Sequence, residues 1–562
     1  MTLSDITLTQ RTSYCGDLRA VNIGDTVTLF GWASKVRDLG KVIFIDLRDR
    51  SGVVQLVFDE TIPATTLELA KSVKPEYVLA ISGVVRERSA KNKDIPTGDI
   101  EIESSNLLII STAETTPYEI TDDCKTSEAL RMHHRYLDLR RPVMQQNILF
   151  RNKLTKLTRD YFHENGFIEI ETPTFINSTP EGARDYLVPS RVHPGKFYAL
   201  PQSPQIYKQL CMVAGFDKYF QIARCYRDED LRADRQPEFT QIDLEMSFVD
   251  QNDVMSMVEE YLRRVMLELL GIDIGVIPRI TYSDAMARYG SDKPDLRYGL
   301  EIVDVSDILP ETRGIKSPKI SRKQIDKLSE YSKGINGRGI TTHTANFIEP
   351  EQREALINRF KLDGDELILL SRDSLDRLGG VRVELARALG IIPTGVFKPV
   401  WITEFPSYEY DAEQNAYQAM HHPFTAPLAE DADRLESDMS AVRANAYDLV
   451  LNGVEIGGGS IRITDSELQS RVFRLLGMSA ESAAGKFGYL LEAFKYGVPP
   501  HGGLALGLDR LVMQLLECAS IRDVIAFPKL QNASDPMTNA PSDVDITQLS
   551  ELGLGLLAPT NA

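Results

Sequence analysis

The sequence predicts a multidomain α+β protein, and three observations carry this prediction. The chain has 562 residues, more than one hydrophobic core normally organises, so we expect roughly three or four domains. Strand patterns with Gly and Asp turns fill the first part, helical patterns follow, and glycine-rich strands return near the end. No apolar run is long enough to cross a membrane. The expected divisions are 1–115, a linker over 116–142, then 143–295, 296–415 and 416–562.

Composition indicates an intracellular protein. The five cysteines are scattered, odd in number and without a Cys-x-x-Cys pair, which argues against a disulfide framework and a structural zinc site. The N-terminus lacks an apolar signal core, so we expect a cytoplasmic location. The net charge is −18, but a nucleic-acid surface needs only a local basic excess, such as the one over 131–159. A solvated helix explains that excess equally well, so charge does not decide the partner.

The first division predicts a small β-barrel. Five strands are expected at 27–32, 42–47, 53–58, 77–85 and 100–110, which suits a barrel of the OB type. Such barrels bind single-stranded nucleic acid with aromatic platforms and polar edges. We predict base contacts from Phe44 and Gln55, with Arg37 nearby for a phosphate or a base. Phe44 lies in an apolar run, so a core position is the alternative.

A charged hairpin over 224–245 is the most informative segment. Alternating residues flank a turn with charges of both signs, and its arginines are suited to clamping phosphates. Phe239, Gln241, Asp243 and Glu245 share one strand face, where buried charges need partners. A solvated hairpin is the alternative. The order Arg-Asp-Glu, loop, Phe-Thr-Gln resembles the nucleotide-binding hairpin of class II aminoacyl-tRNA synthetases.

Helices and strands are also expected before and after this hairpin in the sequence. A helix over 143–165, closed by Gly166, and a strand over 167–173 ending in proline resemble the first class II motif, which builds the dimer interface in that family. A second helix is expected over 254–270. Two strands, the second rich in glycine, are expected over 447–462, and a strand over 502–510 leads into a helix over 511–516. The division 296–415 is predicted to be an inserted α+β module, and its sequence does not indicate a function.

Activation of a carboxylate with ATP needs cations on the phosphates and an in-line pose. Arg227 and Arg510 suit the two ends of the triphosphate and are the predicted catalytic pair. Glu229 would hold the adenine amino group, and Gln236 lies in the loop that closes over the nucleotide. Asp448 and Glu455 flank a turn and would hold Mg²⁺ against phosphate oxygens; two surface acids are the alternative.

The charged residues also predict which amino acid the site would bind. An acidic side chain requires cations held in place by acids, and Arg462 with Lys208 supplies them. Gln205 and Asp243 would receive the α-ammonium group. Two loop residues, Glu181 and His421, are predicted to close over the substrate, although a lone histidine is often structural.

Long strings of residues resemble the bacterial-type aspartyl-tRNA synthetase family over nearly the whole chain. They are Thr-Pro-Glu-Gly-Ala-Arg-Asp from position 179, Gln-Ser-Pro-Gln from 202, the hairpin from 227, and Met-His-His-Pro-Phe from 420. The resemblance implies an N-terminal OB-type barrel, an antiparallel class II sheet with flanking helices, and a homodimer. It also implies two steps, in which aspartate and ATP give aspartyl-adenylate and pyrophosphate, and tRNA(Asp) then receives the aspartyl group.

The same resemblance implies roles for individual residues. Aspartate would be bound by Glu181, Arg227, His421, Arg462 and the segment from Gln205 to Lys208. ATP would be bound by Arg227, Asp228, Glu229, Gln236, Glu455, Gly507, Leu508, Asp509 and Arg510.

Several alternatives stay open at this point. Some family members also charge tRNA(Asn), and Leu39, where relaxed members often carry His, favours the discriminating type. A lysyl or asparaginyl synthetase fits the cations Arg462 and Lys208 less well. A catalytically dead RNA-binding relative would lack nucleotide ligands that are present here, and an amide ligase would not need the barrel.

Overall fold

The computed structural model describes residues 11–179, 182–333, 339–412 and 415–556. The chain forms two compact units, residues 1–146 with 536–538, and residues 147–535 with 539–562. Among the described residues, no helix has the length and apolar character needed to span a membrane.

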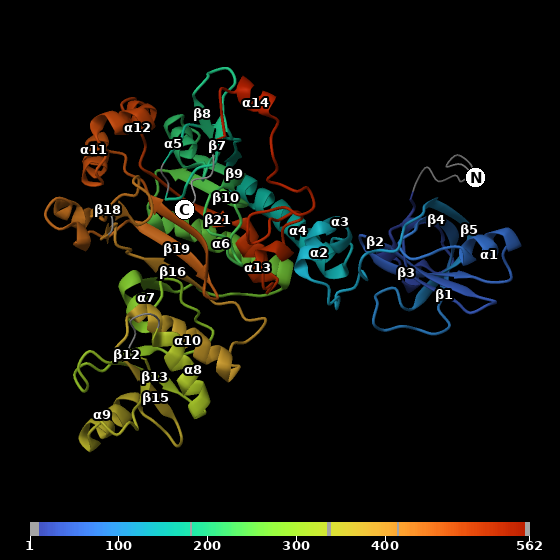
Figure 1. Cartoon of the computed structure of the whole chain (residues 1–562), viewed down its shortest axis with the longest axis horizontal. Helices are drawn as coiled ribbons and strands as arrows, with labels where there is room; N and C mark the ends of the chain where they lie inside the picture. The colour runs from blue at the N-terminus through green and yellow to red at the C-terminus, as the bar shows by residue number, and fades with distance from the viewer. Residues whose placement is uncertain (1–10, 180–181, 334–338, 413–414, 557–562) are drawn as a thin grey trace. The chain divides into compact units, whose positions relative to one another are not determined.

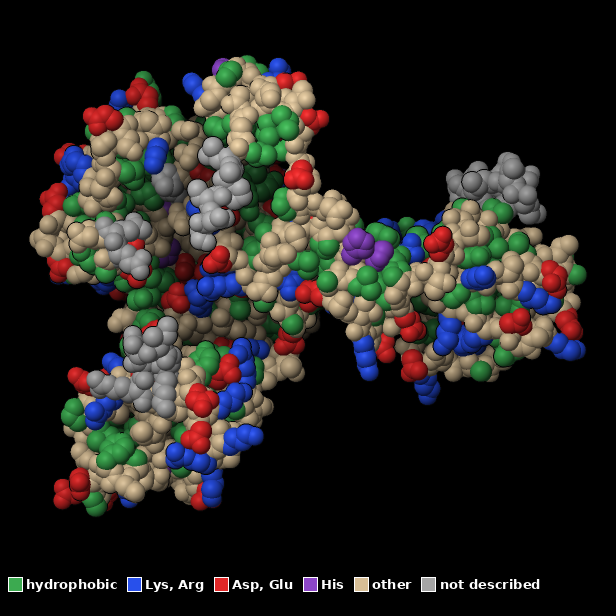
Figure 2. All heavy atoms as spheres, viewed as in Figure 1, with side chains coloured by type: hydrophobic (Ala, Val, Ile, Leu, Met, Phe, Trp, Pro, Cys, Tyr) green, Lys and Arg blue, Asp and Glu red, His purple; other side chains and the backbone are tan. Residues whose placement is uncertain are grey.

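The first unit contains a closed five-stranded barrel, which confirms the predicted OB-type domain (Figure 1). The strands follow the order β1-β2-β3-β5-β4, with β3 and β5 parallel and the other pairs antiparallel. A helix that the sequence analysis did not predict, α1 (Ala64–Lys71), joins β3 to β4. Acidic and basic side chains are interspersed over the visible face (Figure 2). The strands are β1 (Thr26–Asp38), β2 (Ile43–Asp49), β3 (Gly52–Phe58), β4 (Val78–Glu87) and β5 (Ile100–Ser111).

The predicted linker carries two short helices, α2 (Glu128–His133) and α3 (Arg135–Asp138), ahead of the long helix α4 (Pro142–Glu164). Arg140, between α3 and α4, donates to Oε2 of Glu76 at 2.7 Å. Glu76 is buried on the barrel and also accepts two bonds from Arg48. Since a buried carboxylate must be paired, these contacts fix the linker to the barrel within the first unit.

The second unit is built on an eight-stranded sheet in the order β11-β16-β19-β20-β21-β10-β9-β6. Its inner pairs are antiparallel, and only the outermost pairs, β11 with β16 and β6 with β9, are parallel. This arrangement confirms the antiparallel class II sheet. The strands are β6 (Ile168–Glu169), β9 (Lys218–Tyr226), β10 (Glu238–Ser247), β11 (Arg279–Thr281), β16 (Pro399–Thr403), β19 (Ala446–Leu451), β20 (Val454–Ile461) and β21 (His501–Gly507).

Helices α4 and α6 (Gln251–Leu270) pack on this sheet through a shared apolar core. Phe162 of α4 stacks on Phe220 of β9, with ring centroids 5.1 Å apart. Asp250 caps the start of α6 with its carboxylate, and Gly271 ends the helix in the left-handed region. Both predicted helices are therefore present near their predicted bounds.

The inserted module has its own sheet, in the order β12-β13-β15-β14, with α8, α9 and α10 around it (Figure 1). The chain rejoins the main sheet at β16, inside the division predicted as 296–415, so the module ends before position 399. Its elements are β12 (Ile302–Asp304), β13 (Arg313–Ser317), α8 (Arg322–Lys333), β14 (Thr341–Thr342), α9 (Pro350–Phe360), β15 (Leu367–Ser371) and α10 (Leu375–Leu389).

Two predicted bounds need correction. The strand expected over 167–173 forms only as the two-residue β6, and the helix expected from 511 begins at Leu508, as α13 (Leu508–Leu515). The remaining elements are α5 (Gln205–Val213), α7 (Tyr282–Tyr289), α11 (Ser466–Leu475), α12 (Ala480–Phe494), α14 (Ile546–Glu551), and the hairpins β7 (Leu187–Pro189) with β8 (Phe197–Ala199) and β17 (Tyr408–Asp411) with β18 (Ala416–Ala419).

Candidate active site

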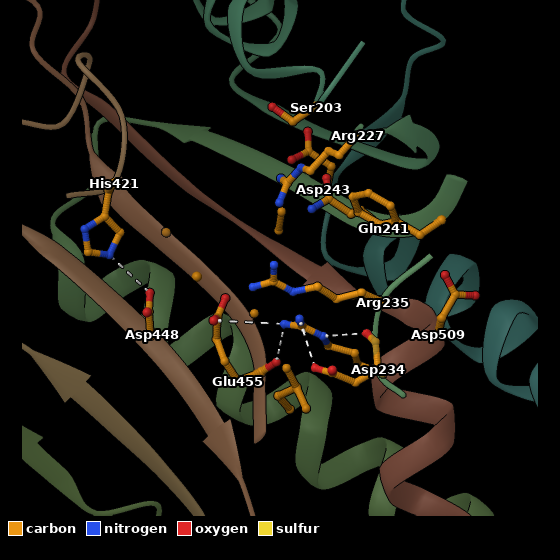
Figure 3. Close-up of a pocket in the computed structure, with 18 of the residues that line it drawn as sticks. Ser203, Arg227, Asp234, Arg235, Gln241, Asp243, His421, Asp448, Glu455 and Asp509 are labelled. Carbon is orange, nitrogen blue, oxygen red and sulfur yellow. Dashed lines mark hydrogen bonds and ion pairs between the residues drawn. The ribbon is translucent and has the colours of Figure 1, made fainter. Parts of the chain in front are cut away.

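A cavity of about 440 Å³ lies on the main sheet. Helix α5, the β9–β10 hairpin with its loop, strands β19 and β20, and the junction of β21 with α13 line it. Figure 3 shows Arg227 and Asp243 on one side of it, and His421, Asp448 and Glu455 on another. The sheet therefore brings together residues that are far apart in the sequence.

Glycines in the central strands leave space for two carboxylates. A Cβ atom on Gly458 would lie 2.5 Å from Oδ1 of Asp448, and one on Gly503 would lie 2.0 Å from Oε2 of Glu245. Both distances are too short for any larger residue without movement of these side chains. The glycine-rich composition of β20 and β21 is thus explained by close packing at the site.

Arg462 is buried and held by several partners. Its Nε and Nη2 donate to Glu245 at 2.8 and 3.0 Å, and its Nη1 donates to Oγ of Ser460 at 2.5 Å and Nε2 of His422 at 2.8 Å. These bonds use four of the five N–H donors of the guanidinium and leave one on Nη2. Burial would raise the pKa of Glu245, but Arg462 and Lys208 lower it to about 2.

Lys208 and Asp243 form a second buried pair. The Nζ of Lys208 lies 2.7 Å from Oδ1 of Asp243, 3.3 Å from Oε2 of Glu245, and 3.3 Å from the Leu244 carbonyl oxygen. Oδ2 of Asp243 and Nε2 of Gln205 have no hydrogen-bond partner among the described residues, and both side chains line the cavity. The Asp243 carboxylate and the Gln205 amide are therefore candidate contacts for a ligand in the cavity.

The hairpin loop holds the predicted nucleotide residues in different environments. The Arg227 guanidinium lies 5.1 Å from the centroid of the Phe239 ring, and its Nε has no partner among the described residues. Glu229 accepts from Arg235 at 3.0 Å. Gln236 exchanges two hydrogen bonds with the backbone of Lys529, at 2.7 and 3.1 Å, which fixes the loop to the C-terminal segment.

Asp509 and Arg510 lie in the first turn of helix α13. Arg510 lines the cavity and donates to the Glu455 carbonyl oxygen at 3.1 Å, while its Nη2 lies 3.2 Å from Oδ2 of Asp234. Asp509 accepts from the Thr240 backbone at 2.7 Å and pairs with Arg151, so it joins α13 to β10 and α4. Gly507 also lines the cavity, whereas Leu508 is buried in the core.

The predicted metal ligands lie on neighbouring strands at one side of the cavity. Oδ1 of Asp448 is 3.4 Å from Nε2 of His421 (Figure 3). Burial raises the pKa of Asp448; burial alone would lower the pKa of His421, but the hydrogen bond and charge of Asp448 raise it. No cluster of three or more His, Cys, Asp or Glu ligands occurs in the described ranges. Two carboxylates fit Mg²⁺, which usually takes one or two protein carboxylates together with phosphate oxygens and water.

The barrel residues form a chain of hydrogen bonds. Arg37 donates to Asp46 and to Gln55, both at 2.9 Å, and Gln55 donates to Glu101 at 2.8 Å. Ile43 and Ile45 are buried in the barrel core, so the half-buried Phe44 between them points to the opposite face of the strand. The centroid of its ring lies 5.8 Å from Cζ of Arg37. Leu39, in the turn between β1 and β2, is 72% exposed.

One further predicted residue lies outside the cavity lining, and another is not among the described residues. Glu181 falls outside the described residues. Asp228 pairs with Arg184 at 3.5 Å and is not part of the cavity lining.

Several lining residues were not predicted from the sequence, among them Asp292 and Lys293. His421 was predicted but the adjacent His422 was not; burial and the nearby Arg462 charge lower the pKa of His422 well below its ordinary value. Their contacts separate the two histidines, because His421 lies against Asp448 and His422 against Arg462, and sequence spacing does not indicate either contact.

Comparison with known proteins assigns the family. The family described as tRNA synthetases class II (D, K and N) matches residues 127–531, and the OB-fold nucleic acid binding domain matches residues 27–110. The chain therefore belongs to the class II tRNA synthetases of this group. Within that group it belongs to the bacterial aspartate–tRNA ligases, as its similarity to individual relatives shows.

An aspartate–tRNA ligase of Ruminiclostridium cellulolyticum is 50% identical, over 97% of this chain and 98% of the relative. An aspartate–tRNA(Asp/Asn) ligase of Caldanaerobacter subterraneus has the same identity and coverage. The solved asparaginyl-tRNA synthetase from Pyrococcus horikoshii, complexed with asparaginyl-adenylate, has a TM-score of 0.62 at 20% identity, over 93% of this chain and 98% of that chain. The last similarity establishes the fold.

Proposed function

We infer that the protein is an aspartate–tRNA ligase that activates L-aspartate with ATP and transfers the aspartyl group to the 3′ end of tRNA(Asp). The observation that carries this inference is the buried pair of cations, Arg462 and Lys208, on the floor of the cavity. It agrees with the names of relatives that are 50% identical over almost the whole chain.

The aspartate side chain would lie against Arg462. One N–H of Nη2 is available, and a second bond forms when the ligand replaces Ser460 or His422 as the acceptor for Nη1. Lys208 donates to Asp243 and to the Leu244 carbonyl oxygen and lies 3.3 Å from Glu245, so it would contribute positive charge and hold Asp243 in place. The carboxylate of Asp243, which lines the cavity, is suited to the α-ammonium group.

ATP would lie across the β9–β10 loop and the start of α13. The guanidinium of Arg227 is suited to the α-phosphate, because Arg227 lines the cavity and its Cζ lies 5.1 Å from the centroid of the Phe239 ring. Arg510 is suited to the far end of the triphosphate, where it exchanges the Asp234 carboxylate for phosphate oxygens. Glu229 is suited to the adenine amino group and would exchange Arg235 for it.

Asp448 and Glu455 would hold Mg²⁺, which supplies positive charge on the phosphate oxygens when bound. The carboxylate of Glu455 is partly exposed to the cavity, and that of Asp448 lies against His421. His421 would help to keep the Asp448 carboxylate oriented toward the cavity.

In the first step, a carboxylate oxygen of aspartate attacks the α-phosphorus of ATP. The bond from that phosphorus to the oxygen of the β-phosphate breaks, and pyrophosphate leaves with the electron pair. In the second step, a ribose hydroxyl of the terminal tRNA nucleotide attacks the aspartyl carbonyl, the bond from the carbonyl carbon to the phosphate oxygen breaks, and AMP leaves with the electron pair while its phosphate takes up the hydroxyl proton. The protein contributes by positioning the reactants and stabilising charge.

The barrel would bind the anticodon through Arg37, Phe44 and Gln55. The exposed Leu39 lies on the adjacent turn and favours preference for tRNA(Asp). The alternative is a relaxed enzyme that also charges tRNA(Asn). Similar relatives carry both kinds of name, which supports this alternative.

We further propose a cytoplasmic homodimer, supported by the resemblance of α4 and β6 to the class II dimer motif and by Ile168, which is 45% exposed on that edge strand. Light scattering at micromolar concentration tests the dimer.

Aminoacylation with labelled aspartate tests the function. Transcripts of tRNA(Asp) and tRNA(Asn) are compared at matched concentrations, with a tRNA for an unrelated amino acid as the control. We expect charging of tRNA(Asp) with a kcat/KM at least about tenfold above that for tRNA(Asn), an anticodon discrimination of roughly 1.4 kcal/mol or more. Equal values for the two transcripts would establish the relaxed form, and no charging of either would contradict the proposal.

A further inference from the structure

The loop that follows α7 brings a lysine from the entry of the inserted module into the cavity. Helix α7 ends at Gly290 in the left-handed conformation, and Asp292 and Lys293 then line the cavity. The Nζ of Lys293 is 2.9 Å from Oδ2 of Asp292 and 3.6 Å from Oε2 of Glu455. The side chain is 43% exposed, so a ligand in the cavity can reach it.

Two cations therefore face the same carboxylate. Nη1 of Arg510 lies 4.0 Å from Oε2 of Glu455, the oxygen that Lys293 also approaches. Lys293 carries the ordinary positive charge of a lysine side chain, and its Nζ is paired with Asp292 beside Glu455. A compact ammonium beside a carboxylate pair is well suited to bind phosphate oxygens as a point charge.

We propose that Lys293 is a phosphate-binding residue of the activation step, contacting the β- and γ-phosphate oxygens of ATP and the pyrophosphate product. This inference rests on the proposed function and assigns the inserted module's entry loop a part in it. As the bond between the α-phosphorus and the bridging oxygen breaks, negative charge grows on the pyrophosphate. The ammonium of Lys293 stabilises that charge together with Arg510, and neither group gives up a proton.

The inserted module holds this loop in place through Arg382 of α10. Arg382 is buried, and its Nη2 donates to the carbonyl oxygens of Asp295, Tyr298 and Gly299 at 2.7, 3.0 and 3.0 Å. Its guanidinium also lies 4.9 and 4.5 Å from the ring centroids of Tyr289 and Tyr298. Arg382 therefore holds the backbone that follows Lys293 in the sequence.

Close packing fixes the other side of the loop. A Cβ on Gly290 would lie 2.1 Å from the Leu375 carbonyl oxygen at the start of α10. Asp295 in turn packs on Gly453, in the turn between the strands that bear Asp448 and Glu455. The loop is thus anchored both to the module and to the strands of the predicted metal site, which makes Arg382 a positioning residue for Lys293.

Direct binding tests the role of Lys293. Titration calorimetry measures the affinity of the full-length protein for Mg²⁺-pyrophosphate and for AMP, which lacks the β- and γ-phosphates. We expect Lys293→Ala to weaken pyrophosphate binding by about 10- to 100-fold, as for loss of a charge-assisted contact, and to leave AMP binding unchanged. Lys293→Arg should recover part of the loss.

The matched control is Lys319→Ala, because Lys319 is an exposed lysine of the same module that pairs with Asp365. It should change neither affinity. Pyrophosphate binding that is unchanged or tighter in Lys293→Ala would overturn the proposal, since the lysine would then only neutralise Glu455. An equal loss for AMP and pyrophosphate would also overturn it, because the effect would not concern the phosphates that AMP lacks.

A double-mutant cycle tests the positioning role. Arg382→Gln should weaken pyrophosphate binding when Lys293 is present and have no further effect in the Lys293→Ala background. Additive losses would contradict the positioning role. Failure here is distinguishable from failure of the proposed function, because the wild-type protein is first shown to catalyse aspartate-dependent ATP–pyrophosphate exchange.

Discussion

Arg462 and Glu245 form a two-bond ion pair, with Nε to Oε1 at 2.8 Å and Nη2 to Oε2 at 3.0 Å, and both side chains are buried. The pair places a fixed guanidinium on the floor of the cavity. Glu245 is held charged by this contact, with its pKa lowered to about 2 by Arg462 and Lys208 against the effect of burial. The cation that we propose to bind the substrate side chain is therefore held in place by a carboxylate on the β9–β10 hairpin.

Replacement of Arg462 by lysine keeps the charge and removes the planar two-bond contact. We expect kcat/KM for aspartate in ATP–pyrophosphate exchange to fall by about 100-fold or more, roughly 3 kcal/mol, because a buried pair loses its geometry. Arg322→Lys is the control, since Arg322 is an exposed arginine of the inserted module. Retention of aspartate activity within a few fold of the wild type would contradict the role of Arg462.

Replacement of Asp243 by asparagine tests the contact with the α-ammonium group. The substitution keeps the shape but removes the charge beside Lys208, and a charge-assisted bond contributes about 1.5–3 kcal/mol. We expect KM for aspartate to rise by roughly 10- to 100-fold while KM for ATP stays within about threefold. Equal effects on both KM values would indicate general damage to the fold, which thermal unfolding would reveal.

Much of the architecture was predictable from local patterns. Period-two strands, glycine turns and amphipathic helices identified the barrel and α4 and α6 near their observed bounds, because burial imposes those periods directly. The two parallel edges of the main sheet were not predictable, since β11 and β16 are separated by the whole inserted module. The pairing of strands that are far apart in the sequence cannot be predicted from the local spacing of apolar residues.

The site divides in the same way. Phe239, Gln241 and Asp243 alternate on β10, and the structure places all three on the cavity, as their shared face predicts. The partners that fix the charges were not predictable. Nothing in the sequence near Arg462 indicates that His422 accepts from it, or that Lys293 approaches Glu455, because both contacts come from loops.

Low pH should weaken the fold through His422. Burial and the Arg462 charge keep its pKa well below the ordinary value, so the unfolded chain binds a proton that the native protein does not. The free energy of unfolding then falls as pH decreases below about 6.5, the ordinary histidine pKa. We expect His422→Gln to lose less unfolding free energy than the wild type between pH 7 and pH 5 in urea titrations. Parallel losses would contradict this assignment.

Removal of the metal should stop activation. Excess EDTA is expected to abolish aspartate-dependent exchange, and Glu455→Gln should raise the Mg²⁺ concentration for half-maximal exchange by about tenfold, since one of two carboxylate ligands is lost. Electron paramagnetic resonance with Mn²⁺ and ATP measures the same loss without turnover. An unchanged metal requirement in Glu455→Gln would remove Glu455 from the predicted site.

The barrel should affect charging but not activation. Arg37→Ala breaks the bonds to Asp46 and Gln55 and uncovers Phe44. We expect kcat/KM for tRNA(Asp) to fall by about 10- to 100-fold, as for loss of a charged contact, with exchange in the absence of tRNA unchanged. Lys41→Ala, a highly exposed cation in the strand β1–β2 connection, is the control. Equal charging by Arg37→Ala and wild type would exclude Arg37 from recognition.

The amino-acid dependence of ATP–pyrophosphate exchange tests the central claim most directly. The purified protein is assayed with aspartate, asparagine and lysine at equal concentrations, without tRNA. Because Arg462 and Lys208 present buried positive charge, we predict exchange with aspartate and at least about 1,000-fold lower kcat/KM with asparagine or lysine, a difference of roughly 4 kcal/mol. Exchange stimulated by asparagine or lysine as strongly as by aspartate would contradict the assignment.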